Sequence, residues 1–280
     1  MLEHGVPWRL SDRVQRLVAP NPGAMTGPGT NTYLLGTESV TVLDPGPAID
    51  EHVDAILAAG SGRIRHIICT HTHPDHSPAW KALAAATGAT VIGALPGGDD
   101  HQDETFAPDI ELHHEYCHRD DGYSLRALHT PGHVSNHYCF LLEEEGMLFA
   151  GDHIMNGSTV VIIPPGGDML AYIDSLHLLL DHQIHAIAPG HGELIHDSEL
   201  EIRRLVEHRL GREAKVMAGV DAVGPGDLDR LVTWVYDDVD PALHPWAKLS
   251  MHAHLIKLQR EGRVTCSEAG HWRAATAGCA

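Results

Sequence analysis

The sequence predicts an α/β or α+β fold in which helices cover mixed β-sheets. Short apolar or alternating runs recur through the first two thirds of the chain, and stretches with helical spacing lie between some of them. The segment LLEEEGMLFAGD reads as a hairpin, which indicates antiparallel pairing. Together these features favour a layered domain. The expected strands are 32–35, 40–43, 66–69, 90–92, 125–128, 138–142, 147–150 and 186–188, and the expected helices are 50–59, 78–87 and 168–181.

The last third of the chain has a different pattern. Residues 198–220 show one long helical period, and the breaker VGPGDLD follows them. Helices are expected at 228–236 and 247–260, before the strand pair RVTCSE and HWRAA. Helices followed by a two-stranded wing suggest a winged-helix module. We therefore expect two domains, residues 1–210 and 211–280.

Composition limits the class of protein. A hydrophobic content of 43% and a charged content of 20% are typical of a globular chain, and no apolar run is long enough to span a bilayer. The N-terminus shows no export signal, so we expect a cytoplasmic protein. Five scattered cysteines without a CxxC pair favour reduced thiols: Cys69, Cys117, Cys139, Cys266 and Cys279.

Charge is unevenly distributed. The net charge is −19, and residues 1–200 hold 8 Lys and Arg against 27 Asp and Glu, whereas residues 201–280 hold 11 of each kind. Because an acidic body repels phosphate backbones, nucleic-acid binding is disfavoured for the first segment. The neutral C-terminal segment escapes that argument.

The stretch THTHPDHS gathers ligand-type side chains directly after an expected strand. Imidazole nitrogens and carboxylate oxygens are suitable ligands for zinc, and a bound cation offsets the cost of crowding them. Strand ends commonly present functional groups. The alternative is a polar loop in a chain that contains 24 histidines. The candidate ligands here are His71, His73, Asp75 and His76.

Three further segments repeat one pattern, in which an apolar run leads to a small turn residue and then to a ligand-type side chain. They are TPGH, AGDH and APGHG, and they supply His133, Asp152 and His191. Glycine in such a turn allows the backbone to approach a shared centre closely. Taken singly, each would more often be a surface histidine or a turn aspartate.

With these segments in this order, the chain resembles the metallo-beta-lactamase superfamily over roughly residues 10–200. The resemblance implies a four-layer αββα sandwich and a site for two divalent metal ions. Zinc is the default, and manganese or iron could use the same ligands. It implies that His71, His73 and His133 hold one metal, that Asp75, His76 and His191 hold the other, and that Asp152 bridges them.

A narrower resemblance covers almost the whole chain. NPGAMTGPGTNTYLLG, STVVIIPPGGDMLAYIDSL and the C-terminal helices are similar to the lactamase-beta-like group with a winged-helix tail. That group includes single-stranded endoribonucleases, bacterial hydrolases and polyketide thioesterases, and its site is similar to that of glyoxalase II. The match of VLDPG implies that Asp44 supports the metal loops without ligating, although a plain turn aspartate is the alternative.

The implied chemistry is hydrolysis by a metal-activated hydroxide, which suits ester, thioester, amide and phosphodiester bonds. Asp75, as a ligand next to the hydroxide, is the best candidate to orient it and receive a proton, and it is the one ligand expected also to be catalytic. No GxSxG nucleophile segment competes with this mechanism. An export signal would be needed to reach a periplasmic β-lactam, so that substrate is less favoured.

Other histidines receive separate interpretations. His129 is expected to be structural, and His153 either touches the site or points away from it. A cluster in the acidic segment is interpreted as solvated surface, with a secondary metal-binding patch as the alternative. Tyr172 either lines a substrate groove or packs in its helix. The members of the cluster are His101, His113, His114 and His118, with Asp103, Glu104, Asp109, Glu111 and Glu115 around them.

Two substrate classes compete. We favour a small acyl substrate, most of all a thioester, and keep single-stranded RNA as the alternative. RNA binding calls for clustered cations and stacking aromatics, but aromatics are 5% of the chain. The tail arginines alternate with glutamates, which predicts a solvated face: Arg203, Arg204, Arg209 and Arg212 with Glu201, Glu207 and Glu213. A third hypothesis, a homo-oligomer surface around a degenerate site, conflicts with seven filled ligand positions.

Overall fold

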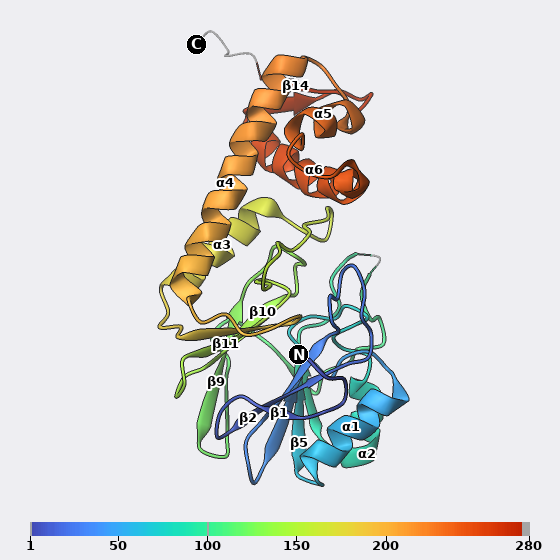
Figure 1. Ribbon diagram of the computed structural model, residues 1–280, viewed down its shortest axis with the longest axis vertical. Coiled ribbons are helices and arrows are strands. Elements are labelled where there is room, and N and C mark those ends of the chain that lie inside the picture. Colours follow the sequence, from blue (N-terminus) through green and yellow to red (C-terminus); the bar gives the residue numbers. More distant parts are fainter. Residues whose placement is uncertain (1, 100, 276–280) are drawn as a thin grey trace.

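The computed structural model describes residues 2–99 and 101–275. Two β-sheets face each other, and helices cover both outer faces, with the long helix α4 leading to a C-terminal group of helices (Figure 1). The four layers are helices α1 and α2, the first sheet, the second sheet, and helix α3 with the start of α4. The predicted αββα sandwich is therefore confirmed.

The first sheet has its strands in chain order. Strands β1 to β4 pair antiparallel, and β4 to β7 pair parallel. Parallel neighbours need a crossover, and helices provide it for two of the three parallel pairs: α1 (Asp50–Gly60) joins β4 to β5, and α2 (Trp80–Thr87) joins β5 to β6. The strands are β1 (Trp8–Arg9), β2 (Val14–Val18), β3 (Asn31–Leu35), β4 (Val40–Leu43), β5 (Ile64–Ile68), β6 (Thr90–Gly93) and β7 (Ile110–Glu111).

The second sheet has the order β12-β11-β10-β9-β8. The predicted hairpin is present, with Leu142 opposite Met147. Strands β11 and β12 are parallel, and helix α3 (Met169–Leu180) lies in the connection between them. The strands are β8 (Cys117–Asp120), β9 (Tyr123–His129), β10 (Tyr138–Leu142), β11 (Met147–Gly151) and β12 (Ala186–Pro189).

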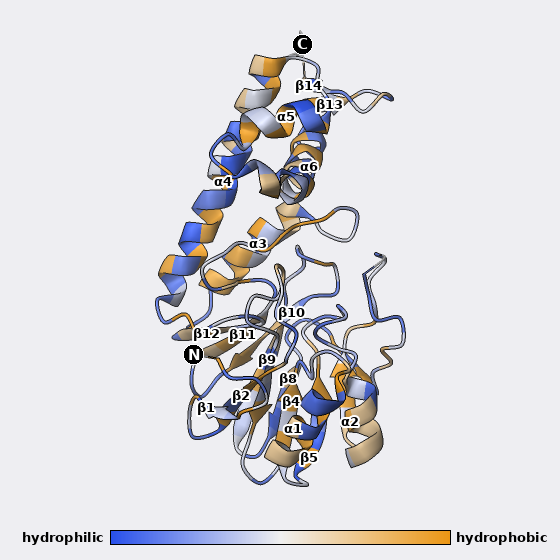
Figure 2. Cartoon of the chain, turned by 45° about the vertical axis from the view of Figure 1, so that its right-hand side comes forward, coloured by the Kyte–Doolittle hydropathy of each residue, from blue (hydrophilic) through white to orange (hydrophobic). Residues whose placement is uncertain are grey.

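The central strands are buried on both faces, which explains their continuous apolar runs. In β10, Cys139 and Leu141 face helix α3, whereas Phe140 and Leu142 face the first sheet. Phe140 is 1% exposed, and burying such a side chain contributes roughly 2–3 kcal/mol. Orange strands line the space between the sheets in Figure 2, as this pattern requires.

Helix α4 (Ser198–Val223) links two hydrophobic cores. Near its start Ile202 and Leu205 pack on the sandwich, and near its end Val216 and Val220 pack on the C-terminal helices. The expected division between residues 210 and 211 falls inside this helix, and it stays a prediction. The C-terminal elements are α5 (Leu228–Val235), the 3-10 turn η1 (Pro241–Leu243), α6 (His244–Arg260), β13 (Val264–Cys266) and β14 (Trp272–Ala274).

Strands β1, β2, β7 and β8 were not predicted. Strand β2 has a charged residue at its centre, but Arg16 is only 4% exposed because it pairs with Glu193 at 2.9 Å. Strand β8 reads CHRD and carries no apolar alternation. Tertiary pairing therefore decided both strands.

Two predictions from composition can be compared with the structure. Four cysteines are free, as expected, and Cys279 lies outside the described residues. Among the described residues, no helix combines the length and the apolarity that crossing a bilayer demands.

Candidate metal centre

Four strand ends meet at one edge of the sandwich. The loop after β5 carries His71 to His76, and the segments after β9, β11 and β12 carry His133, Asp152 and His191. Strands β9, β11 and β12 run in the same direction, so their carboxyl ends share an edge of the second sheet. All seven residues implied by the family resemblance lie within this edge.

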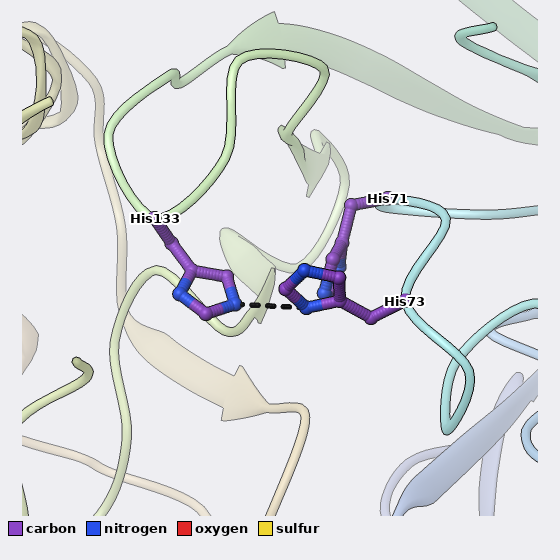
Figure 3. A group of neighbouring side chains, drawn as sticks. All are labelled: His71, His73 and His133. Carbon is purple, nitrogen blue, oxygen red and sulfur yellow. Dashed lines mark hydrogen bonds between the residues drawn. The ribbon is translucent and has the colours of Figure 1, made fainter. Parts of the chain in front are cut away.

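Three of the histidines form the first group. The rings of His71 and His73 have centroids 4.6 Å apart, and those of His73 and His133 are 4.7 Å apart. His133 Nε2 lies 3.0 Å from His73 Nδ1, the pair joined by the dashed line in Figure 3. One ring nitrogen from each residue lies within 4.8 Å of the other two. The three imidazoles can therefore share one cation.

The second group contains Asp75, His76 and His191. Asp75 Oδ2 lies 3.4 Å from His76 Nε2 and 3.3 Å from His191 Nε2. The Asp152 carboxylate lies between the groups. Its Oδ1 is 3.3 Å from the Nε2 atoms of His76 and His191, and its Oδ2 is 3.9 Å from His133 Nε2. One carboxylate thus faces both groups of ligands, with one oxygen toward each.

The outer ring nitrogens of four of the histidines are held by hydrogen bonds. Such contacts fix the orientation of a ligand imidazole and leave its Nε2 free to point inward. The Nδ1 atoms bond as follows: His71 to Thr70 Oγ1 at 3.0 Å, His76 to Asp44 Oδ2 at 3.0 Å, His133 to Val161 O at 3.0 Å, and His191 to Gly29 O at 3.2 Å.

Asp44 is a buried support of this edge. Its carboxylate accepts hydrogen bonds from Thr70 N at 2.7 Å and Thr70 Oγ1 at 2.8 Å, besides its contact with His76. The residue is 1% exposed and has a φ of 51°, a left-handed conformation that a non-glycine residue seldom adopts. These contacts exclude the plain turn aspartate considered from the sequence.

The protonation states of the first group and of the Asp152 carboxylate both favour binding of a cation. Burial and the neighbouring His76 lower the pKa of His71 well below its ordinary value, and burial with His133 lowers the pKa of His73 to about 4. Both imidazoles therefore keep free lone pairs. Burial alone would raise the pKa of Asp152, but His191 and His76 outweigh it and hold that pKa well below its ordinary value. The carboxylate is accordingly ionised.

These residues fit a pair of divalent cations. The buried atoms His71 Nε2, His76 Nε2 and Asp152 Oδ1 have no hydrogen-bond partner within the described part of the chain. An unpaired buried polar atom is destabilising by roughly 1–3 kcal/mol, and ligation removes that cost. The backbone also comes close, because a Cβ at Gly190 would lie 2.6 Å from Asp152 Oδ1.

Sequence reasoning missed His137, which is fully buried beneath the centre. Its Nε2 accepts a hydrogen bond from Asp152 N at 3.2 Å, and its Nδ1 contacts Thr130 Oγ1 at 3.0 Å. It therefore fixes the turn that presents Asp152. The surrounding GHVSNH looks like a surface turn, so no signal in the sequence identifies this role.

Other candidates near the centre are structural. The ring of His153 packs 4.7 Å from that of Tyr172, whose OH donates to His153 O at 2.9 Å. Of the alternatives considered, Tyr172 packs in its helix, and His153 packs on Tyr172. His129 bonds Ser135 O at 3.0 Å, in agreement with the structural role expected for it.

Two predictions of solvated surface were wrong in part. His118 is only 6% exposed because strand β8 covers the first sheet, whereas His113 and His114 are exposed as expected. In α4, Arg209 is 3% exposed and donates to Val160 O at 2.6 Å, and Glu213 is 5% exposed. The docking of α4 on both cores buries them.

Comparison with known proteins identifies the family. The family model described as the metallo-beta-lactamase superfamily matches residues 25–191. The chain belongs to this superfamily. It is a hydrolase of the metallo-beta-lactamase fold, and the model of the beta-lactamase associated winged helix domain matches residues 228–272. The winged helix predicted for the tail is thereby confirmed.

Individual metallo-beta-lactamase relatives cover much of the chain. The beta-lactamase-like protein 2 homolog of Drosophila melanogaster is 32% identical over 93% of this chain and 92% of its own. An atrochrysone carboxyl ACP thioesterase of Passalora fulva is 31% identical over 76% of this chain and 63% of its own. A beta-lactamase domain protein from Burkholderia ambifaria has a TM-score of 0.83 at 18% identity, covering 98% of this chain and 95% of its own.

Proposed function

We propose that the protein is a dinuclear metal-dependent hydrolase of small acyl thioesters. The observation that carries the proposal is the Asp152 carboxylate, whose two oxygens face the two groups of histidines. In this proposal His71, His73 and His133 hold one cation, and Asp75, His76 and His191 hold the other. Zinc suits this set of nitrogen and oxygen ligands.

Two bound cations would lower the pKa of a shared water to near neutrality and polarise the acyl oxygen of the substrate. The chain itself provides the proton acceptor. Burial alone would raise the pKa of Asp75, but His76 and His191 hold it at about 2, so the carboxylate is ionised at neutral pH. Thr30 Oγ1 donates to Asp75 Oδ2 at 3.3 Å and orients it. In this proposal Asp75, ionised and oriented by Thr30, positions the attacking water and receives its proton.

The reaction forms a carbon–oxygen bond at the acyl carbon and breaks the carbon–sulfur bond. The products are a carboxylic acid and a thiol, and the proton taken up at Asp75 is available to the leaving thiolate. Thiolates are good leaving groups, so the leaving sulfur needs no separate strong acid.

A cavity of about 120 Å³ beside the centre supports a small substrate. His73 and His133 form its inner end, and the segment 163–166 forms its opposite wall. Asp99 and His101 also line it, and the described lining residues include no lysine or arginine. No lysine or arginine of the described lining would therefore neutralise a phosphate chain along this cavity, whereas a neutral acyl group needs no such partner. The thioesterase relative is consistent with that preference.

The test is a side-by-side assay of the zinc-loaded protein. Acyl thioesters of increasing chain length should release free thiol, and labelled single-stranded RNA should remain intact. His73→Ala should abolish thiol release, and the exposed His114→Gln serves as the matched control and should retain it. Cleavage of RNA without thioester hydrolysis would overturn the substrate assignment in favour of the endoribonuclease alternative.

A further inference from the structure

A second cluster of histidine and aspartate lies away from the catalytic centre. His66 is on β5, and His118 and Asp120 are on β8. His66 precedes His71 by five residues, and β5 ends at Ile68, before the loop that carries the ligands of the centre. The cluster therefore shares no residue with the proposed catalytic site. It joins a strand of the first sheet to the edge strand of the second.

Its geometry is that of a ligand set. His66 Nδ1 lies 3.1 Å from Asp120 Oδ2, and the rings of His66 and His118 have centroids 4.5 Å apart. One ligand atom from each of the three residues lies within 4.8 Å of the others. Ligands at 2.0–2.1 Å from a tetrahedral zinc are about 3.3 Å apart, so the cluster needs only a small contraction to close on an ion.

Hydrogen bonds hold the cluster from behind. His118 Nε2 lies 3.2 Å from Thr41 Oγ1, and the Tyr123 phenol donates to the same oxygen at 2.7 Å. Ser39 Oγ donates to Asp120 Oδ2 at 2.6 Å. Imidazole and carboxylate ligands of metals are commonly oriented by such contacts. Burial and the neighbouring His66 also lower the pKa of His118 to about 4, which leaves this imidazole neutral.

Within residues 2–99 and 101–275, ligand-type atoms gather this closely in four groups. Three of those groups belong to the catalytic centre, and His66, His118 and Asp120 form the fourth. An ordinary ion pair of His66 and Asp120 would not need a second imidazole beside it. We propose that these three residues bind one further divalent transition-metal ion, zinc in the first instance, which ties the two sheets together.

The fourth ligand position is open to solvent. The side chains of His66 and Asp120 are 26% and 17% exposed, so water can reach the ion. With three protein ligands and one water, the site resembles an open zinc site rather than a closed one with four protein ligands. An ion at this position would connect β5 of the first sheet to β8 of the second sheet. This inference goes beyond the proposed function and does not depend on it.

The test measures zinc by equilibrium dialysis and elemental analysis. In a background with His73→Ala, Asp152→Ala and His191→Ala, the proposal predicts one zinc per chain. Adding Asp120→Asn should weaken that zinc at least ~10-fold, while the control His114→Gln should leave it unchanged. In the otherwise unaltered chain, Asp120→Asn should lower the zinc content by one equivalent.

A second variant and a second readout guard against misfolding. His66→Gln alters a partly exposed side chain and should give the same loss as Asp120→Asn. Zinc should raise the melting temperature of the background variant and no longer do so after either substitution. A background variant that binds no zinc, or substitutions that leave its zinc affinity unchanged, would overturn the inference.

Discussion

The metal-centre edge and the interface between α4 and α6 both bury charged groups, but they balance that charge differently. At the interface, Glu213 Oε2 lies 2.7 Å from Lys257 Nζ, and Glu213 Oε1 lies 2.9 Å from Arg263 Nη1. At the centre, the cationic groups found within 4.0 Å of Asp75 and Asp152 in the described residues are histidines alone.

This difference separates a structural ion-pair network from a ligand site. The chain supplies permanent cations where the charge is needed only for stability. At the centre the carboxylates face only imidazoles as cationic groups among the described residues, and in the proposed function bound cations share in balancing their charge. Arg209 of α4 is another permanent cation with a structural role. It donates a hydrogen bond to Val160 O, and its guanidinium lies 5.0 Å from the Tyr172 ring centroid.

The largest expected effect comes from Asp152→Ala. Losing the carboxylate that faces both ligand groups should remove metal and lower kcat/KM about 1000-fold, the upper range for removing one electrostatic group from an active site. Metal analysis and thioesterase assays measure both changes. Circular dichroism should show an intact fold. Full metal content in this variant would contradict the assignment of this edge as a ligand site.

A smaller loss is expected from Gly190→Ala. The added Cβ would lie 2.6 Å from Asp152 Oδ1 and 2.7 Å from His76 Cε1, so the ligands must shift. Misplacing reacting groups by about 1 Å can lower the rate about 100-fold. Gly211→Ala is the matched control, because nothing lies within 4 Å of its Cβ position. Unchanged kinetics for Gly190→Ala would show that the centre is less tightly packed than inferred.

Stability should respond at the other region. Glu213→Gln removes the buried carboxylate that Lys257 and Arg263 share and leaves them only Glu261 among the described acidic groups, so it should lower the free energy of unfolding by about 2–3 kcal/mol. Denaturant unfolding followed by tryptophan fluorescence measures the change. Thioesterase activity per folded molecule should be retained, in contrast to both variants above. A loss of activity as large as that of Asp152→Ala would contradict this separation.

The same carboxyl predicts a pH dependence. Burial alone would raise the pKa of Glu213, but the neighbouring His254, Lys257 and Arg263 outweigh it and hold the pKa at about 2. The folded value lies below the unfolded one, so the stabilisation is complete above about pH 4.5 and is lost as the pH falls toward 2. The stability gap between the wild type and Glu213→Gln should therefore narrow across that range. A stability difference that stays constant as the pH falls would contradict the lowered pKa of Glu213.

The smallest effect belongs to the exposed part of α4. Arg203 Nη2 lies 2.8 Å from Glu199 Oε1, and their side chains are 58% and 71% exposed. Such pairs contribute about 0.3–0.5 kcal/mol. Arg203→Ala should therefore change the unfolding free energy by no more than about 0.5 kcal/mol. A change above 1 kcal/mol would mean that charge pairs on this helix matter even where solvent surrounds them.

Much of the fold was predictable because the hydrophobic period and the length of a segment depend only on residues that are close in the sequence. The runs at β3, β4 and β10 carry strand patterns that extend over both buried faces, and α4 carries an uninterrupted helical period. Strand β8 was not predictable, because CHRD carries no apolar alternation and is placed by pairing with β9 and by contacts with the first sheet. His118 is buried because β8 lies against the first sheet, so its burial could not be predicted without the strand.

The sequence by itself determined the order of ligand-type residues, the small turn residues before them and the family that this order resembles. Only the tertiary structure decided that Asp152 faces two groups at once, that His137 holds its turn, and that His66 meets His118 across the sheets. The physical reason is the separation along the chain of the residues that interact. Turns and periods depend on neighbouring residues, whereas distances between ligands depend on strand register and on how two sheets pack.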